Sequence, residues 1–374
     1  MDLRPLMMVR FVLFLVLLSN TACSQTKETE IFDEETANAS FRDLVKLNFP
    51  EGNVFIGAAT QFDLLSTRRG DLLKEFGYIT PSNSFKLTRV HPEPGQWNWE
   101  QADDWIKLGE ENKQVIRLHA PISPQCSKWV KGDERTSEEL EIILEEYVTG
   151  LCQKYNDVDN VIWLDVVNET IAPDGSWFGP KKGVDLWENP WTIIGYDQSH
   201  DLKPPLYISK AFKIANEFAP DIKLIVNQHG QFEPEVWEKM KELIRYLKDM
   251  GLRVDGVGWQ AHVSVGWEKI NDNIERLSKW ISWAHGQNLE FHVTENTVWI
   301  EGEHQWSEQA ETFSAILRTL LENRDSGVVG WNVWQLVDQD TQRKMNGCIY
   351  DIDLRPKPAY FAIKDLLAHP PYPK

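Results

Sequence analysis

The chain has 374 residues, of which 42% are hydrophobic, and it carries a formal net charge of -18 with a pI near 5.0. This length suffices for a full hydrophobic core in one large domain or in two ordinary ones. The acidic balance argues against binding to nucleic acid and against attachment to an anionic membrane surface.

The first 23 residues resemble an export signal. Arg4 and Arg10 precede the apolar run FVLFLVLLS, which is too short to span a bilayer as a helix. The end NTAC resembles a bacterial lipoprotein cleavage box with Cys23 as the lipidated residue, although Asn20 stands where an aliphatic residue is usual. Ordinary signal cleavage is the alternative. We expect an exported protein, at the periplasmic or outer-membrane surface if Cys23 is lipidated and secreted otherwise.

The segment after the signal, residues 24–45, is polar and is predicted to be a tether. Three cysteines follow it, Cys126, Cys152 and Cys348. If Cys23 carries a lipid, this odd count leaves at least one thiol unpaired, and the sequence does not choose the pairing. The spacing of Cys and His residues does not suggest a zinc site.

Eight short apolar runs, each with a polar end, alternate with amphipathic helical patterns. The runs are VFIGAAT (54–60), FGYITP (76–81), QVIRLHA (114–120), NVIWLDVVNE (160–169), IKLIVNQ (222–228), VDGVGWQAH (254–262), LEFHVTE (289–295) and VVGWNVWQL (328–336). Helical patterns between them include residues 136–155, 209–219, 234–250, 273–287 and 307–324.

Near-continuous apolar strands that alternate with helices indicate a parallel sheet covered by helices. Eight such units in this length favour an α/β fold of the (β/α)8 TIM-barrel type over an open, doubly wound sheet. The dinucleotide fingerprint GxGxxG is absent from the sequence, which weighs against a Rossmann fold. We therefore expect one barrel domain over residues 46–374.

In such a barrel the functional groups come from the carboxyl ends of the strands. The polar residues expected there are Asn83, Lys86, His119, Asn168, Glu169, Asn227, Gln260, His262, Glu295, Trp334 and Asp338. A single polar residue at a strand end usually marks only the start of a loop. Here most of the predicted strands bring polar groups to one face, which predicts a site.

Glu169 and Glu295 end the fourth and seventh predicted strands, which face each other across an eight-stranded barrel. Two facing carboxyls are the minimum equipment for glycoside hydrolysis. One must be protonated to assist the leaving oxygen, and the other must be ionised to attack or to activate water. Both residues follow strongly apolar strands, which unrelated surface carboxylates would not explain. The 17 tryptophans suit a large aromatic core, and the alternative is that several line a groove and stack on sugar rings.

At these motifs the chain resembles glycoside hydrolase family 10, the retaining endo-β-1,4-xylanases. WLDVVNE is similar to the family's acid/base segment W-D-V-V-N-E, which implies that role for Glu169 and a sugar contact for Asn168. FHVTE resembles the nucleophile segment and implies that role for Glu295. GVGWQAH is similar to the family's G-I-G-x-Q-x-H, which includes Gln260 and implies that His262 orients the nucleophile.

Weaker matches flank this centre, and the likeness spans roughly residues 50–370. TPSNSFK resembles T-P-E-N-x-x-K, and further matches occur in RLHA, LIVNQH, NVWQLVD and RPKPAYFAI. These matches imply that sugars are bound by Asn83, Lys86, His119, Asn227 and Trp334.

The sequence also departs from the family around the glycone sugars. Ser82 stands where the family has Glu, Gln228 follows the strand-end Asn where Asp is usual, and Gln342 stands where a second lid Trp falls. The segment RLHAPISPQCSKWV lacks the Trp and second His of the family's R-G-H-x-L-V-W-H. We therefore expect an altered or decorated sugar to be accepted beside the catalytic pair.

The resemblance implies a retaining hydrolase of β-1,4-xylan or a related decorated glycan, endo-acting and monomeric, which requires no metal or organic cofactor. Two alternatives stay open. The protein could be a related retaining β-glycanase with a non-xylan substrate, or a surface glycan-binding protein without turnover. The expected partner is a polysaccharide or oligosaccharide in every case, with a lipid anchor at Cys23 as an additional prediction.

Overall fold

The computed structural model of the protein describes residues 38–130, 135–180, 189–270, 272–341 and 345–374. The predicted signal, Cys23 and Gln342 lie outside these residues. Residues 39–374 form one compact unit. Among the described residues, none of the helices combines the length and apolar character needed to cross a membrane.

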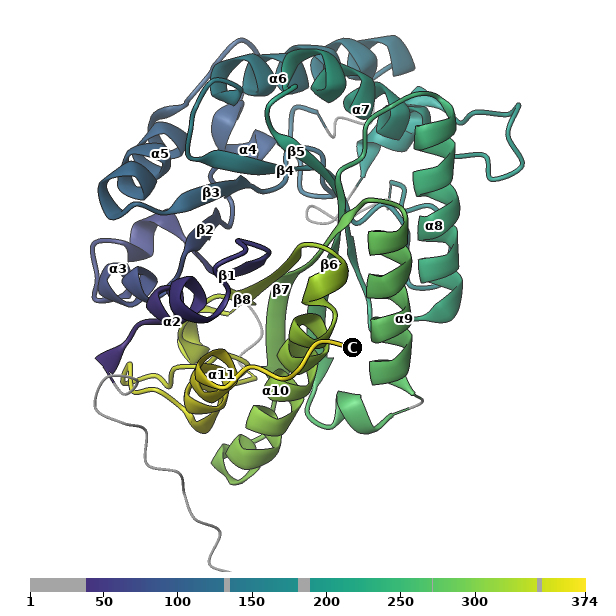
Figure 1. Cartoon of the computed structure of the whole chain (residues 1–374). Helices are drawn as coiled ribbons and strands as arrows, with labels where there is room; N and C mark the ends of the chain where they lie inside the picture. Colours follow the sequence, from purple (N-terminus) through teal and green to yellow (C-terminus); the bar gives the residue numbers. More distant parts are fainter. Residues whose placement is uncertain (1–37, 131–134, 181–188, 271, 342–344) are drawn as a thin grey trace, which may run out of the picture. The chain divides into compact units, whose positions relative to one another are not determined.

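Eight parallel strands close into a barrel in sequence order, with β8 paired to β1 (Figure 1). The strands are β1 (Val54–Thr60), β2 (Tyr78–Pro81), β3 (Val115–Leu118), β4 (Val161–Asn168), β5 (Lys223–His229), β6 (Gly256–Ser264), β7 (Glu290–Trp299) and β8 (Val329–Trp334). All eight predicted runs therefore contain strands, and the predicted (β/α)8 barrel is confirmed.

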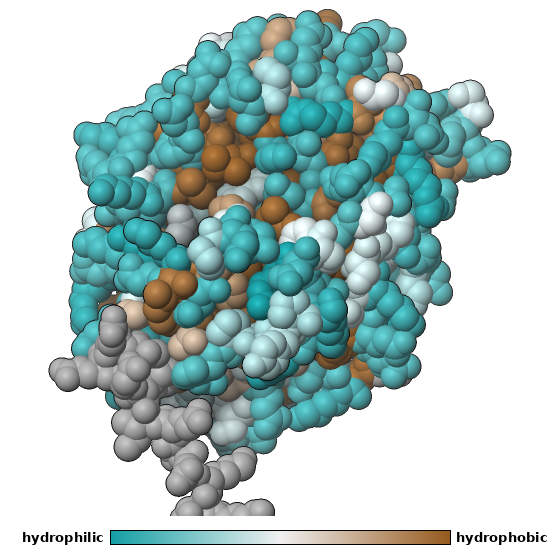
Figure 2. Space-filling model, in the orientation of Figure 1, coloured by the Kyte–Doolittle hydropathy of each residue, from teal (hydrophilic) through white to brown (hydrophobic). Residues whose placement is uncertain are grey.

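Helices surround the strands in Figure 1 and cover the outer face of the barrel. They are α2 (Phe41–Asn48), α3 (Arg69–Leu72), α4 (Leu87–Val90), α5 (Glu100–Asn112), α6 (Ser137–Tyr155), α7 (Leu206–Phe218), α8 (Pro234–Asp249), α9 (Asn273–Gly286), α10 (Trp306–Glu322) and α11 (Pro358–Ala368). The apolar side of each long helix packs inward, because strands of a parallel sheet must be buried on both faces. The face drawn in Figure 2 is accordingly mainly hydrophilic, with hydrophobic side chains visible in patches between polar ones.

Helix α2 lies partly inside the segment predicted as a tether. Ser40 caps it, since its hydroxyl accepts from the backbone N–H of Asp43 and the Asp43 carboxylate accepts from the backbone N–H of Ser40. Phe41 and Leu44 are buried. The packed unit therefore starts before residue 46, and residues 39–45, which were predicted as part of the tether, belong to the packed unit.

Glycines on three strands make room for large side chains inside the barrel. A Cβ on Gly57 would lie 2.4 Å from the ring of Tyr78, and one on Gly330 would lie 2.1 Å from Nδ1 of His292. A Cβ on Gly258 would lie 2.2 Å from Oδ1 of Asn227. These strands can carry only glycine here, because every larger residue would displace the lumen side chains.

Most of the described tryptophans belong to the core rather than to a groove. The fully buried indoles are Trp105, Trp163, Trp191, Trp237, Trp259, Trp267 and Trp331. Trp299 and Trp334, at the ends of β7 and β8, are half-buried. Other indoles pack partly buried against this core, and Trp299 and Trp334 lie at the barrel mouth.

Local irregularities occur in both strands that deliver the predicted catalytic glutamates. The pairing of β4 with β5 shifts between Asp165 and Val167, within the last three residues before the strand ends at Asn168. The pairing of β6 with β7 shifts so that Trp259 opposes Val293 while Gln260 opposes Glu295. A bulge turns the following side chain toward a different face, and in β7 this places Glu295 beside Gln260.

Candidate active site

Glu169 directly follows β4 in a strained backbone conformation. Its φ is +56°, in the left-handed region that a residue with a side chain seldom adopts. Its backbone N–H donates to the carbonyl of Asn227 across a distance of 3.0 Å. The carboxyl is almost fully buried, and its Oε1 accepts a hydrogen bond of 3.1 Å from Nδ2 of Asn168. Strain of this kind clusters at functional sites.

Glu295 lies on β7 and is buried among several hydrogen-bond donors. Nε2 of Gln260 donates to its Oε1 at 2.8 Å, and Nε2 of His262 lies 2.9 Å from its Oε2. Nε2 of His119 lies 3.3 Å from Oε1. The predicted contact between His262 and Glu295 is therefore present, and His119 adds a second imidazole.

These surroundings favour the ionised form of Glu295. Burial alone would raise the pKa of its carboxyl, but the hydrogen bond from His262 and the charges of His119, His262 and Lys86 outweigh it and lower the pKa. Glu295 is thus held as a carboxylate, the form that a nucleophile needs. By contrast, the Glu169 carboxyl accepts a hydrogen bond from the neutral amide of Asn168.

A buried ion pair between Arg117 and Asp165 contacts His119 and fixes the orientation of its ring. Asp165 on β4 accepts from Nε of Arg117 on β3 at 3.0 Å, and its Oδ2 lies 2.8 Å from Nδ1 of His119. All three side chains are buried. The Asp165 carboxylate can only accept, so Nδ1 of His119 carries the proton, and this fixes the ring with Nε2 toward Glu295.

An amide network connects the two glutamates. Nε2 of Gln260 donates to Oδ1 of Asn168 at 2.9 Å as well as to Glu295. Nδ2 of Asn227 donates to the same Asn168 oxygen at 2.8 Å, and Oδ1 of Asn227 accepts from Thr294 at 2.7 Å. Asn227 is fully buried. We therefore assign Asn227 a supporting role under Asn168, in place of the predicted sugar contact.

Lys86 lies between the two carboxyls and the loop that follows β3. Burial lowers its pKa, while the charges of Glu295 and Glu169 act in the opposite direction. Its Nζ donates to Oε1 of Gln125 at 2.7 Å. Asn83, from the same loop as Lys86, is half-buried. Both residues follow the carboxyl end of β2, and the contact of Lys86 with Gln125 was not anticipated.

The mouth carries two half-buried indoles. The ring of Trp334 lies with its centroid 5.3 Å from that of His119 and 6.3 Å from that of His262. Trp299 is stacked parallel to His262 at 6.2 Å. On its other side, Nδ1 of His262 lies 2.9 Å from Oγ1 of Thr297. Trp334 thus borders the nucleophile through the two histidines.

The departures from the family pattern have distinct surroundings. Ser82 is buried, and its hydroxyl makes no hydrogen bond with the described residues. Gln228 hydrogen-bonds both the N–H and the carbonyl of Ile171, at 3.2 and 2.7 Å, and so fixes the loop after β4. Asp338 forms a buried ion pair with Lys357 at 3.1 Å and braces the loop after β8 rather than joining the carboxyl pair.

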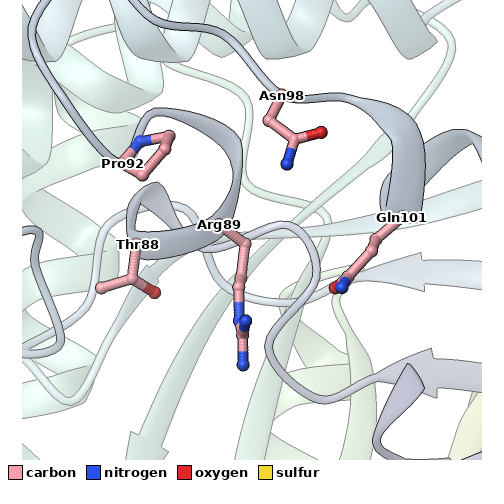
Figure 3. A pocket seen from close by; sticks show the side chains of 5 residues that line it. All are labelled: Thr88, Arg89, Pro92, Asn98 and Gln101. Atoms are coloured by element: carbon pink, nitrogen blue, oxygen red, sulfur yellow. The ribbon is translucent and has the colours of Figure 1, made fainter. Parts of the chain in front are cut away.

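Two other features lie outside this cluster. A shallow cavity of about 150 Å³ is lined by Thr88, Arg89, Pro92, Asn98 and Gln101 (Figure 3), none of which is a predicted site residue. Across the described residues there is no group of three or more His, Cys, Asp or Glu side chains placed to hold a metal ion. The three cysteines found there are buried and are not joined by disulfides.

The arrangement therefore has two buried carboxyls, delivered by β4 and β7 of a (β/α)8 barrel and linked by amides, with one of them held ionised by imidazoles. These features define the class of barrel glycoside hydrolases. The sequence model of glycosyl hydrolase family 10 matches residues 44–366. The chain belongs to this family, and it is a glycoside hydrolase.

Relatives and solved structures agree with this placement. Endo-1,4-beta-xylanase A of Caldicellulosiruptor saccharolyticus is 31% identical over 335 residues, which cover 82% of this chain and 92% of that protein. Endo-1,4-beta-xylanase B of Thermotoga neapolitana is 27% identical and covers 79% and 81%. The structure of xylanase 10B from Thermotoga petrophila in complex with xylobiose is 26% identical, with a TM-score of 0.73 over 89% of this chain and 98% of that chain.

Proposed function

We propose that the protein is a retaining endo-1,4-β-xylanase with Glu169 as acid/base and Glu295 as nucleophile. The observation that carries this proposal is the pair of buried carboxyls in unlike surroundings. Glu295 faces Gln260, His262 and His119, whereas Asn168 faces Glu169. The surroundings that keep Glu295 ionised suit it as the nucleophile, which leaves the acid/base role to Glu169. The names of the curated relatives favour xylan as the substrate.

In the first step Glu169 gives its proton to the glycosidic oxygen as the bond to the anomeric carbon breaks. Glu295 attacks the same carbon and forms a covalent glycosyl-enzyme ester. The amide network helps here, because the hydrogen bonds of Gln260 and Asn168 fix the positions of the two carboxyls relative to each other.

In the second step Glu169 is a carboxylate and takes a proton from water. The water oxygen bonds to the anomeric carbon, the ester bond breaks, and Glu295 leaves with the electron pair. Two displacements at one carbon give net retention. This chemistry requires a carboxyl separation of about 5–5.5 Å, and it uses no metal or organic cofactor.

We further propose that the substrate is a decorated xylan chain. Support comes from the residues expected beside the glycone sugars. Gln125 accepts a hydrogen bond from Lys86, and Ser82 has a short side chain whose hydroxyl has no partner among the described residues. A short side chain leaves space for a substituent, and an amide offers hydrogen bonds in place of an indole stacking face. A non-xylan β-glycan is the alternative that an altered wall leaves open.

The test compares wild type with Glu169→Ala and Glu295→Ala on glucuronoxylan, arabinoxylan, linear xylan and mixed-linkage glucan. Glu301→Ala is a matched control, because Glu301 is exposed just after β7. We expect wild type and control to release reducing ends, most rapidly from decorated xylans, and both active-site variants to lose turnover by several orders of magnitude. Azide should rescue them on an activated aryl xylobioside, giving a β-azide with Glu169→Ala and an α-azide with Glu295→Ala.

Other outcomes identify the alternatives. Products from mixed-linkage glucan alone would indicate a non-xylan glycanase. Binding of xylan without release of reducing ends by wild type would indicate a glycan-binding protein. We also propose export and a lipid at Cys23 from the sequence of residues 1–23, and a monomeric enzyme.

A further inference from the structure

His229 stands out among the groups that the mechanism above does not use. It is the last residue of β5, and its neighbour along the barrel is Gln260 on β6. Nδ1 of His229 is buried and has no hydrogen-bond partner among the described residues. The same atom lies 3.9 Å from Oε2 of Glu169. An orphaned buried nitrogen beside the acid/base carboxyl calls for an explanation.

We propose that His229 is a positioning residue that holds Glu169 while it is ionised, in the second half of the reaction. This inference rests on the proposed retaining mechanism. The Nδ1–H of His229 would donate to Oε2 of Glu169 once the proton has left for the glycosidic oxygen. Closing the gap from 3.9 Å to a charge-assisted bond of about 2.8 Å requires a shift of about 1 Å.

The surroundings of Glu169 show why such a donor is needed. Glu169 as a whole is 7% exposed, and Asn168 donates to its Oε1. A buried carboxylate with one oxygen unpaired is costly, because its lost hydration is not replaced. His229 is the group that the described residues place next to the second oxygen.

The open distance is consistent with the first half of the reaction. A hydrogen bond to Oε2 in the resting enzyme would favour the carboxylate, and the acid would then have no proton to give. At 3.9 Å the two atoms are too far apart for a hydrogen bond. The contact therefore forms after proton transfer, and it accelerates hydrolysis of the glycosyl-enzyme rather than its formation.

The test uses dinitrophenyl xylobioside, whose activated leaving group makes hydrolysis of the glycosyl-enzyme rate-limiting. In His229→Phe we expect kcat and KM to fall together by roughly tenfold, the worth of one hydrogen bond to a charged group, with kcat/KM unchanged. His229→Asn keeps a donor near the position of Nδ1 and should restore most of kcat. A trapped fluoroxylobiosyl-enzyme should turn over more slowly in His229→Phe, as followed by intact mass.

A fall in kcat/KM with KM unchanged, or an Asn variant as slow as the Phe variant, would overturn the proposal. His229→Ala serves if the Phe variant does not fold, and the same joint fall in kcat and KM is expected. Failure of the underlying function looks different, because wild type itself would then release no dinitrophenol.

Discussion

The ion pair beneath the nucleophile leads to a quantitative prediction for Asp165→Asn. Its partner Arg117 is 0% exposed and would keep its charge without a counter-ion. Breaking a buried pair by removing one member costs about 3–5 kcal/mol, because the other charge stays desolvated. That is a large share of the roughly 5–15 kcal/mol that stabilises a typical protein.

The pH dependence of stability follows from the same carboxyl. Burial would raise the pKa of Asp165, but Arg117 and His119 lower it from 3.8 to about 2. Since the folded-state pKa lies below the unfolded one, the carboxylate stabilises the fold above about pH 4. This contribution, on the order of 2 kcal/mol, is lost as the pH falls toward 2.

The assay is urea unfolding of wild type and Asp165→Asn at neutral and acidic pH, followed by tryptophan fluorescence. Glu275→Gln is the control, because its pair with Lys279 is exposed and should change stability little. The double variant Arg117→Met with Asp165→Leu should lose less stability than Asp165→Asn. If the free energy of unfolding of Asp165→Asn lies within about 1 kcal/mol of the wild-type value, Asp165 does not compensate the buried charge of Arg117 and the reasoning is wrong.

Three further predictions concern the site and the chain start. In His262→Phe the pKa of Glu295 should rise, because Glu295 stays buried while it loses a hydrogen bond. The acidic limb of the pH profile of kcat/KM should therefore move up by roughly one pH unit. A limb at the wild-type pH would contradict the role of His262. Gly258→Ala should lower the free energy of unfolding by about 1–3 kcal/mol and remove most of the activity, because the new Cβ would displace Asn227. Gly286→Ala is the control, because a Cβ there meets no atom within 4 Å, and it should change neither. Equal losses of stability in the two variants would contradict the claim that Gly258 makes room for Asn227. Cys23→Ala should abolish incorporation of labelled palmitate, and labelling of the variant would refute lipidation.

Most of the barrel could be predicted, because buried parallel strands appear as apolar runs. β6 and β7 nevertheless extend to Ser264 and Trp299, past the predicted ends. Beyond the rim the two strands pair as a ribbon with polar residues such as Thr297, so the apolar signal stops while the pairing continues. Helix α5 is not among the predicted helical patterns, and small residues, Ala102 and Gly109, occupy part of its buried face.

The strand-end residues were predictable, whereas their supports were only partly so. Asp165 left a readable signal: a carboxylate between Leu164 and Val166 in an apolar strand must be paired if buried. Its partner Arg117 lies on another strand, and only the closed barrel brings the two together. Gln125 and the bulge before Glu295 depend on loop conformation and local register, which residue patterns do not specify.

The assignment of His119 and Asn227 shows the same limit. Both residues lie near the carboxyl ends of predicted strands, and the sequence predicts sugar contacts for both. In the structure His119 faces Glu295, and Asn227 is enclosed by Asn168 and Thr294. Position along a strand predicts which residues approach the mouth, but the depth at which each lies depends on its neighbours on adjacent strands.

The central claim, that Glu295 attacks the anomeric carbon while Glu169 handles the proton, is tested most directly by trapping the glycosyl-enzyme. A dinitrophenyl fluoroxylobioside forms the ester rapidly and hydrolyses slowly, so the labelled residue can be located by peptide mass mapping. We predict a single label on Glu295 in the wild-type enzyme and none in Glu295→Ala. A label on Glu169 or on any other residue would contradict the account.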